Sequence, residues 1–402
     1  MAPKNRIILD TDPGVDDTMA MLLALSASPE DLELVLLSVT YGNVPLQSCL
    51  RNVVALFHVI EKEIAWREAN SKPNSFESLK HFKPLVAVGP DHPLEEDCLM
   101  ADYFQGDSSA NPSPYFTPAK LPAHKEILRI LREEPENTIS ICAVGPLTNI
   151  AMAAAEDPET FLRVKELVVM GGSVHIPGNI TPVGEFNTYA DAVAAARVYA
   201  LTSPTPASTM PPVPSHAATL PPYPEKLSKQ LKLSLCPLDI TTPHSLYKSF
   251  FERSIKPHVD AGSPLARWIG HILAGTFNKI TDMVGDQVEP DLSLHDPLTV
   301  WYMMTRDDPA WQGTPTLEDI RIETSGQWTR GMHLVDKRNR SKPAAKESTQ
   351  SVENPDDSLL LDEVPGDTQG WLSHTKGNRI NRIVKSPGED KLAPLWMKQV
   401  FG

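Results

Sequence analysis

The sequence predicts an α/β fold built on an open, doubly wound and mostly parallel sheet that is flanked by helices, in the manner of a Rossmann fold. Short runs rich in valine, isoleucine and leucine alternate along the chain with longer segments whose apolar residues recur at helical spacing. Continuous apolar runs are typical of parallel strands buried on both faces, and strand–helix alternation is the pattern of a doubly wound sheet. Ligands of such sheets bind beyond the carboxyl ends of the strands.

Each predicted strand is a short run rich in valine, isoleucine and leucine. In chain order these runs are Arg6–Asp10, Leu32–Thr40, Pro84–Gly89, Thr138–Val144, Glu166–Met170 and Leu231–Leu238. Each predicted helix is a longer segment whose apolar residues share one face at the helical period. In the same order the helices are Asp17–Ser26, Val44–Ala69, Ala123–Glu134, Leu147–Glu156, Ala190–Thr202 and Pro264–Lys279.

Three segments interrupt this alternation. Residues 204–224 contain eight prolines, which fix φ and lack an N–H group, so we expect a polyproline-like surface loop within an insertion at about 203–226. Residues 337–370 contain no aromatic residue and can bury little apolar surface, so we expect a flexible polar insertion there. A shorter polar interruption covers Glu68–Phe82. With these insertions, residues 1–402 form one predicted domain.

The composition argues against several classes of protein. Basic residues number 37 and acidic residues 51, and the net charge of −14 is opposite to that of nucleic-acid surfaces and polybasic membrane anchors. No apolar stretch is long enough to span a membrane, and the N-terminus lacks the apolar region of a signal peptide. We therefore expect a cytoplasmic protein without nucleic-acid or membrane partners. The four cysteines form no C-x-x-C pair, which argues against a zinc ribbon or a thioredoxin-type site.

The strongest feature is an acidic cluster at the carboxyl end of the first predicted strand. It consists of Asp10, Asp12, Asp16 and Asp17. The start of the following helix favours negative charge and relieves part of the repulsion between these carboxylates, and a cation would relieve the rest. Hard oxygen ligands select Ca²⁺ or Mg²⁺ over zinc. The sequence therefore predicts a site for one of these ions.

Other interpretations of the same acids fit less well. An EF-hand loop counted from Asp10 would need a bidentate glutamate where this chain has Met21, and Pro13 would distort the loop. A helix N-cap with acids that have no further role is the plainest alternative. An aspartyl-phosphate nucleophile, as in haloacid-dehalogenase-type phosphatases, is another, but two further acids crowd it and disfavour attack on a phosphate.

Separate motifs along the chain together resemble the inosine-uridine-preferring nucleoside hydrolase family. The segment Asp10–Asp17 (Asp-Thr-Asp-Pro-Gly-Val-Asp-Asp) matches the N-terminal signature of that family. The later landmarks follow in the order of the family, at Tyr41–Asn43, Val144–Asn149, Met170–Gly172, Gly178–Pro182 with Glu185–Asn187, and His295–Leu298. The resemblance spans about residues 6–335 and implies the nucleoside hydrolase fold.

The resemblance implies a chemical role for each matching position. Asp12, Asp17 and Asp296, with the backbone carbonyl of Val144, would bind one Ca²⁺, and Asp12 would be the general base that takes a proton from the attacking water. The ribose hydroxyls would be held by Asp16, Asn43, Asn179, Glu185, Asn187 and Asp296. Phe186 and Met170 would lie near the nucleobase, although core packing explains Met170 equally well.

The leaving group depends on different residues. In the family a histidine at the position of His295 contacts the base and can protonate it as it leaves, while a histidine that only orients Asp296 is the plainer interpretation. Many members also carry a second histidine near the base where this chain has Gln105, so the preferred nucleobase is left open.

We therefore expect a Ca²⁺-dependent enzyme that hydrolyses ribonucleosides of the uridine/inosine class to ribose and free base, for nucleoside salvage or catabolism. A homo-oligomer, either dimer or tetramer, is the expected assembly. The alternative from another class is a catalytically silent member of the fold that binds a nucleoside or Ca²⁺, although no predicted ligand is missing.

Overall fold

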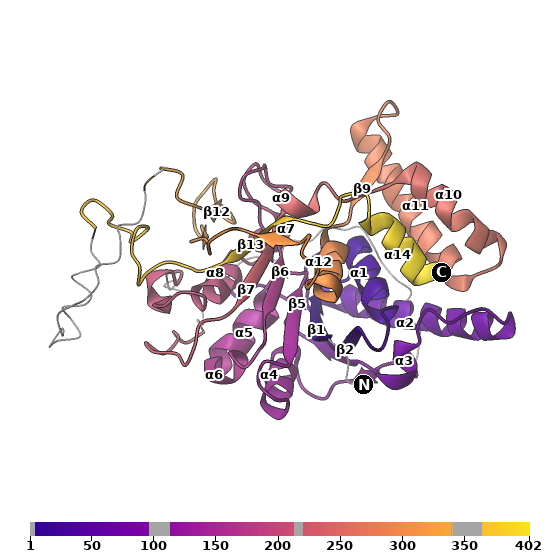
Figure 1. Ribbon diagram of the computed structural model, residues 1–402, viewed down its shortest axis with the longest axis horizontal. Helices are drawn as coiled ribbons and strands as arrows, with labels where there is room; N and C mark the ends of the chain where they lie inside the picture. Colours follow the sequence, from indigo (N-terminus) through magenta and orange to yellow (C-terminus); the bar gives the residue numbers. More distant parts are fainter. Residues whose placement is uncertain (1–4, 96–112, 213–219, 339, 341–363) are drawn as a thin grey trace.

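The structure, a computed structural model, describes residues 5–95, 113–212, 220–338, 340 and 364–402. A twisted sheet runs through its centre with strand order β10-β13-β7-β6-β5-β1-β2-β3-β4 (Figure 1). All neighbouring strands in it are parallel except β10 and β13. The strands are β1 Asn5–Thr11, β2 Leu32–Val39, β3 Leu85–Val88, β4 Thr117–Pro118, β5 Ile139–Ala143, β6 Leu167–Met170, β7 Leu233–Cys236, β10 Gln312–Gly313 and β13 Asn381–Lys385. The predicted mostly parallel α/β sheet is confirmed.

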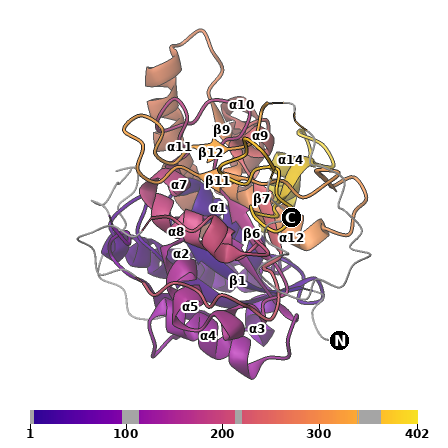
Figure 2. The same cartoon turned by 90° about the vertical axis from the view of Figure 1, so that its left-hand side faces the viewer.

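Helices cover both faces of this sheet and enclose two apolar cores. In β1 the side chains of Ile7 and Leu9 enter one core and that of Ile8 enters the other, as the period of two along a strand requires. The first core is covered by α1 Val15–Leu25, α2 Leu46–Ala69, α10 Lys248–Asp260, α11 Pro264–Val284, α12 His295–Thr305 and α14 Leu392–Phe401. The second is covered by α4 Ala123–Glu133, α5 Thr148–Glu156, α6 Pro158–Phe161 and α8 Ala192–Ala200. Figure 2 shows α10 and α11 at the opposite end of the molecule from α4 and α5.

All six predicted strands are present, and the predicted helices are present with changed limits. The helix predicted over Ala190–Thr202 is interrupted, because Asp191 leaves the helical conformation and its side chain caps α8 by accepting a hydrogen bond from Ala194 N. The residues before it form a separate short helix, α7 Phe186–Ala190. The helix predicted to end at Lys279 continues as α11 to Val284 and ends at Gly285, which has φ of +85°.

Two of the predicted interruptions contain short ordered elements. The segment Glu68–Phe82 holds the last turn of α2 and a short helix, α3 Ser78–His81, because Ser78 donates a hydrogen bond to Leu25 O and Leu79 is buried. The proline-rich segment packs where it is described: a 3₁₀ turn, η1, covers Pro206–Ser208, and Tyr223 is buried beneath the guanidinium of Arg197. Most of the polar insertion predicted at 337–370, and Gln105, lie outside the described residues.

The last part of the chain contains elements that the sequence did not predict. Among them, α14 lies against α1, where Trp396 is fully buried and its Nε1 donates a hydrogen bond to Met19 O at 2.9 Å. Two small sheets also form, pairing β8 Ser245–Tyr247 with β9 Asp291–Ser293, and β11 Arg321–Ile322 with β12 His333–Leu334. Of these strands, β11 lies within a segment whose sequence is strand-like, Asp319–Ser325. No helix in the described parts of the chain is both long and apolar enough to cross a membrane.

Candidate active site

The turn between β1 and α1 is organised by Asp17. This residue is at the third position of α1, and its Oδ2 accepts a hydrogen bond from Gly14 N at 3.0 Å, which is one half of a capping box. Its Oδ1 accepts from the Thr11 hydroxyl at 2.6 Å and from Asp12 N at 3.1 Å. Since the carboxylate ties both ends of the turn together, the fold fixes the positions of the neighbouring acids.

Asp12 is fully buried at the end of β1 with one oxygen free for a ligand. Its Oδ2 accepts a hydrogen bond from Asn43 N at 2.7 Å, whereas its Oδ1 has no hydrogen-bond partner among the described residues. The space beside Oδ1 exists because residue 145 is glycine, and a Cβ there would stand 2.5 Å from that oxygen. An unpaired carboxylate oxygen out of contact with water is unfavourable, so this geometry favours a water or a cation at Oδ1.

Asp10, by contrast, does not join the other acids. Its side chain is buried on the far side of the turn, where it accepts hydrogen bonds from the Ser38 hydroxyl and from Asn149 Nδ2. Burial raises the pKa of Asp10 to about 7. The prediction that four carboxylates share one site is therefore wrong for this one. A buried Asp10 also speaks against the phosphatase alternative, which needs it as an accessible nucleophile.

Three carboxylates converge beside Asp12 from two distant parts of the sequence. Oxygen atoms of Asp16, Asp17 and Asp296 all lie within 4.8 Å of one another, with Asp296 carried by the first turn of α12. Burial, reinforced by the neighbouring carboxylates, raises the pKa values of Asp12 and Asp296 well above their ordinary range. Removal from water and the adjacent charge of Asp17 raise the pKa of Asp16 to about 7. Such a cluster needs protons or a cation to be stable.

The donor set suits a hard divalent cation. The three side chains of the cluster all offer carboxylate oxygen, which is the ligand that Ca²⁺ and Mg²⁺ prefer. The carbonyl oxygen of Val144, at the end of β5, accepts a hydrogen bond from Asn187 Nδ2 at 2.8 Å. Of the four predicted metal ligands, Asp17 and Asp296 belong to the close triplet, while Asp12 lies outside it with its unpaired Oδ1.

A cavity of about 190 Å³ opens above the acids at the carboxyl ends of the strands. Its lining contains every predicted site residue except Asp12 and Asp17, and one residue that was not predicted, Ile180. The lining residues are Asp16, Asn43, Val144, Met170, Asn179, Ile180, Glu185, Phe186, Asn187, His295 and Asp296. The lining thus combines polar groups with apolar side chains, as expected of a pocket for a small polar ligand with an apolar part.

Glu185 is the best-held polar group of this lining. Its carboxylate caps α7 and accepts hydrogen bonds from the backbone N–H groups of Asn187 at 2.8 Å, Thr188 at 3.0 Å and Gly172 at 2.7 Å. Burial raises its pKa. The side chain of Asn179 accepts a hydrogen bond from Phe186 N at 2.9 Å, which ties the preceding loop to the same helix. This wall of the cavity is therefore preorganised.

His295 enters the cavity from the start of α12 with its ring fixed from behind. Its Nδ1 lies 2.7 Å from the hydroxyl of Thr241, in α9 Leu238–Thr241. Burial lowers the pKa of His295 to about 4, so the imidazole is neutral near pH 7. Sequence reasoning missed Thr241, because a lone threonine in a short helix carries no signal of a partner more than fifty residues away.

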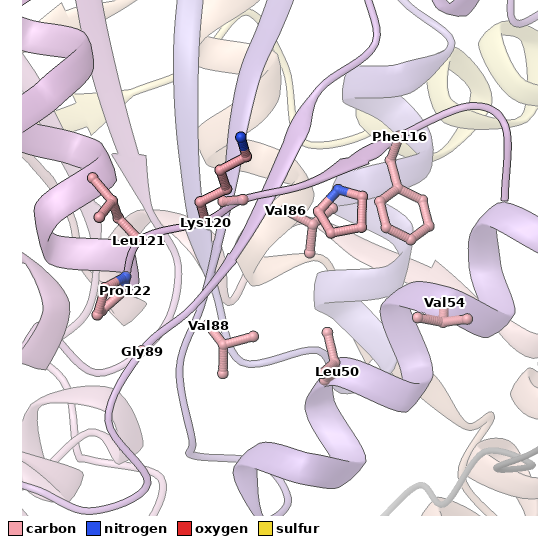
Figure 3. A pocket seen from close by; sticks show the side chains of 11 residues that line it. Leu50, Val54, Val86, Val88, Gly89, Phe116, Lys120, Leu121 and Pro122 are labelled. Carbon is pink, nitrogen blue, oxygen red and sulfur yellow. The ribbon is translucent and has the colours of Figure 1, made fainter. Parts of the chain in front are cut away.

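A larger hollow of about 530 Å³ lies elsewhere, between α2 and the edge of the sheet at β3 and β4 (Figure 3). Apolar side chains such as Leu50, Val86 and Phe116 line it, and Lys120 is the one charged residue among the described residues of its lining. Since none of these described residues is acidic or a histidine, the size of the hollow does not make it the reactive site.

Comparison with known proteins agrees with this geometry. The family model described as "Inosine-uridine preferring nucleoside hydrolase" matches residues 7–359. The chain is 31% identical over 342 residues to an uncharacterised protein of Schizosaccharomyces pombe, covering 82% of this chain and 89% of that protein. It is 28% identical over 335 residues to the pyrimidine-specific ribonucleoside hydrolase RihA of Salmonella newport, covering 82% and 88%.

Two solved structures share the fold. A plant nucleoside hydrolase superposes with a TM-score of 0.65 at 20% identity, and the match covers 99% of each chain. A purine-preferring ribonucleoside hydrolase from Gardnerella vaginalis superposes with a TM-score of 0.66 at 19% identity, and the match covers 98% of each chain. The family model matches most of the sequence, and the acids, the cavity and the fold agree with that match. The chain therefore belongs to the inosine-uridine preferring nucleoside hydrolase family, enzymes that hydrolyse N-glycosidic bonds.

Proposed function

We propose that this protein is a Ca²⁺-dependent ribonucleoside hydrolase that cuts substrates of the uridine/inosine class into ribose and free base, for nucleoside salvage or catabolism. One observation carries the proposal: the unpaired, buried Oδ1 of Asp12 stands beside a carboxylate triplet at the floor of a polar cavity. A general base and a cation site are thereby combined below a pocket for a sugar.

The cation would be held by Asp12, Asp17, Asp296 and the Val144 carbonyl, whose oxygens fit Ca²⁺ by their hardness and charge. When bound, Ca²⁺ supplies the positive charge that makes a nearby water easier to deprotonate. Asp12 then takes the proton, since its Oδ1 has no hydrogen bond to break first. The water attacks C1′ of the ribose as the bond to the base breaks.

The ribose hydroxyls would be bound by the polar lining of the cavity. These residues are Asp16, Asn43, Asn179, Glu185, Asn187 and Asp296. A site built to bond each hydroxyl rejects a substrate that lacks one, because buried polar groups are then left unpaired. We therefore expect ribonucleosides to be preferred over 2′-deoxyribonucleosides.

The base would lie toward Phe186, Met170 and His295 in the same cavity. His295 would hydrogen-bond the departing base, and to protonate it the neutral imidazole must first gain a proton as the substrate binds. This contact matters most for pyrimidines because they are poor leaving groups. The similarity to a pyrimidine-specific relative supports uridine as the first substrate to test.

The deciding experiment measures reducing sugar released from uridine, cytidine, inosine and 2′-deoxyuridine, with Ca²⁺ and with a chelator. We expect release from ribonucleosides that stops when Ca²⁺ is removed. Binding of Ca²⁺ and uridine without release of ribose from any nucleoside would instead support the catalytically silent binding protein.

Three further expectations stay predictions: a homo-oligomeric assembly, a cytoplasmic location and a single domain carrying the two insertions. Light scattering measures the oligomeric state.

Removal of Ca²⁺ should destabilise the protein in a pH-dependent way. In the metal-free fold the pKa values of Asp12, Asp16 and Asp296 are raised above the unfolded value of about 4. Protonation of these groups stabilises the fold below that pH, and this stabilisation is lost as pH rises through about 7. Chelated protein should therefore melt at lower temperature at about pH 8 than at about pH 5.

Added Ca²⁺ should reverse this loss. A ligand at a hundredfold excess over its Kd stabilises the folded state by about 2.7 kcal/mol. Differential scanning fluorimetry across this pH range, with and without Ca²⁺, measures the effect. Identical melting curves, together with a metal analysis that finds no bound ion, would contradict the cation site.

Substitution of Gly145 tests the space that Asp12 requires. In Gly145→Ala the new Cβ would meet Asp12 Oδ1 at 2.5 Å, so the carboxylate must shift. A displacement of about 1 Å in a catalytic group can reduce the rate by about a hundredfold, and we expect a kcat loss of that order with little loss of stability. The matched control is Gly275→Ala on α11, where nothing lies within 4 Å of the added methyl group. Equal kcat in both variants would show that Asp12 needs no such space.

A further inference from the structure

One buried histidine lies directly behind the ribose-facing wall of the cavity. His333, in β12, is 1% exposed, and its Nε2 lies 3.1 Å from the hydroxyl of Tyr199 in α8. The two rings meet edge to face with centroids 5.7 Å apart. The position of the imidazole is thus fixed by a hydrogen bond and by packing.

The hairpin that carries His333 is attached to the loop that carries Glu185. Met332 forms an antiparallel bridge with Gly184, the residue before Glu185. The guanidinium of Arg330 lies 4.2 Å from the ring centroid of Tyr189 and donates a hydrogen bond to Tyr189 O. The hairpin therefore contacts the chain on both sides of Glu185, at Gly184 and at Tyr189.

His333 also meets the peptide that holds this carboxylate from the opposite side. Gly172 has φ of +80°, a left-handed conformation, and its N–H donates to Glu185 Oε2 at 2.7 Å. A Cβ at Gly172 would overlap the His333 ring, so the imidazole packs against the bare Cα. A smaller side chain at 333 would leave the Gly172 peptide unsupported.

We propose that His333 is a positioning residue for ribose binding, one that acts by holding the Gly172 N–H against Glu185. This inference rests on the proposed function, because it assigns Glu185 to the sugar. His333 itself has no access to the cavity, whose lining does not include it. Its role is separate from that of the cation cluster, since its ring bonds to Tyr199 and packs against Gly172.

The test compares His333→Ala with His333→Gln, which keeps a polar group within reach of the Tyr199 hydroxyl. We expect kcat/KM for uridine to fall by about ten- to a hundredfold in His333→Ala, mainly through KM, and to recover largely in His333→Gln. Tyr199→Phe should lie between the two, because it removes the hydrogen bond and keeps the ring. Phe161→Leu, a buried substitution in α6 far from the site, is the control that should lower the melting temperature without changing KM.

A double-mutant cycle shows whether the effect passes through Glu185. In a Glu185→Gln background, His333→Ala should reduce kcat/KM by less than about threefold further, because the group that it positions is already impaired. Additive losses would overturn the inference.

Hydrogen exchange supplies a readout that does not need activity. Peptides covering residues 170–173 should exchange faster in His333→Ala than in the wild type, and unchanged protection there would also overturn the inference. If the wild-type protein hydrolyses no nucleoside, the proposed function fails and the exchange measurement alone decides the role of His333.

Discussion

Asp12→Asn should lower kcat for uridine by about 10⁴-fold, at the upper end of what a positioned general base contributes. The amide can still accept the hydrogen bond from Asn43 N, so the fold and the cavity are preserved. It then presents NH₂ where the carboxylate presents its unpaired oxygen, so it can neither take a proton from water nor attract a cation. Asp12→Ala should abolish turnover altogether.

Steady-state kinetics with saturating Ca²⁺ measure this loss, and circular dichroism checks the fold. The matched control is Asp31→Asn, the same change at an exposed position away from the site, which should leave kcat unchanged. Near-normal kcat in Asp12→Asn would contradict the role of Asp12 as the general base. A loss of activity that is restored by a large excess of Ca²⁺ would assign Asp12 to the cation alone.

His295→Ala should reduce kcat for uridine by about 10²- to 10⁴-fold, the typical contribution of a general acid, with a much smaller change in substrate binding. The reason is that a proton or a strong hydrogen bond is needed by the base only as it departs. With p-nitrophenyl riboside, whose leaving group departs without a proton, the defect should largely disappear. Asp12→Ala should be equally inactive on both substrates, since water must be activated in either reaction.

Comparison of the two substrates separates the possible roles of His295. Equal losses on uridine and on the activated riboside would mean that the ring only shapes the site or orients Asp296. Gln105→His provides the control: it should change the ratio of uridine to inosine activity without rescuing His295→Ala.

The fold could be predicted because its main signal is local. Parallel strands that are buried on both faces have continuous apolar sequences, and each predicted run forms a strand of the sheet. The later elements carry weaker signals. In α12 every side chain from Asp296 to Met303 is buried, and the apolar residues lie all round the helix. The sequence of this helix therefore shows no amphipathic period. The strand β13 has only two apolar residues, Ile383 and Val384, and these lie between Arg382 and Lys385.

The motifs identify most residues of the site but do not show which of them are in contact. The acids after β1 are adjacent in sequence, but which of them meet is decided by partners from distant strands and helices. Asp10 is held away from the cavity by Ser38 and Asn149, and no local pattern shows this. Thr241 and His333 likewise owe their positions to contacts across the fold, with His295 and Gly172. Such roles depend on three-dimensional packing and therefore require the structure.

The distance in sequence between Asp17 and Asp296 has a consequence for the newly made protein. A chain emerging from the ribosome presents β1 and its acids long before α12 has been synthesised, and domains complete their packing only when their late elements arrive. A nascent chain therefore carries an incomplete carboxylate triplet and cannot cleave a nucleoside. The proposed cation site would be complete only after the strands between β1 and α12 have assembled, so Ca²⁺ bound there would mark a finished molecule.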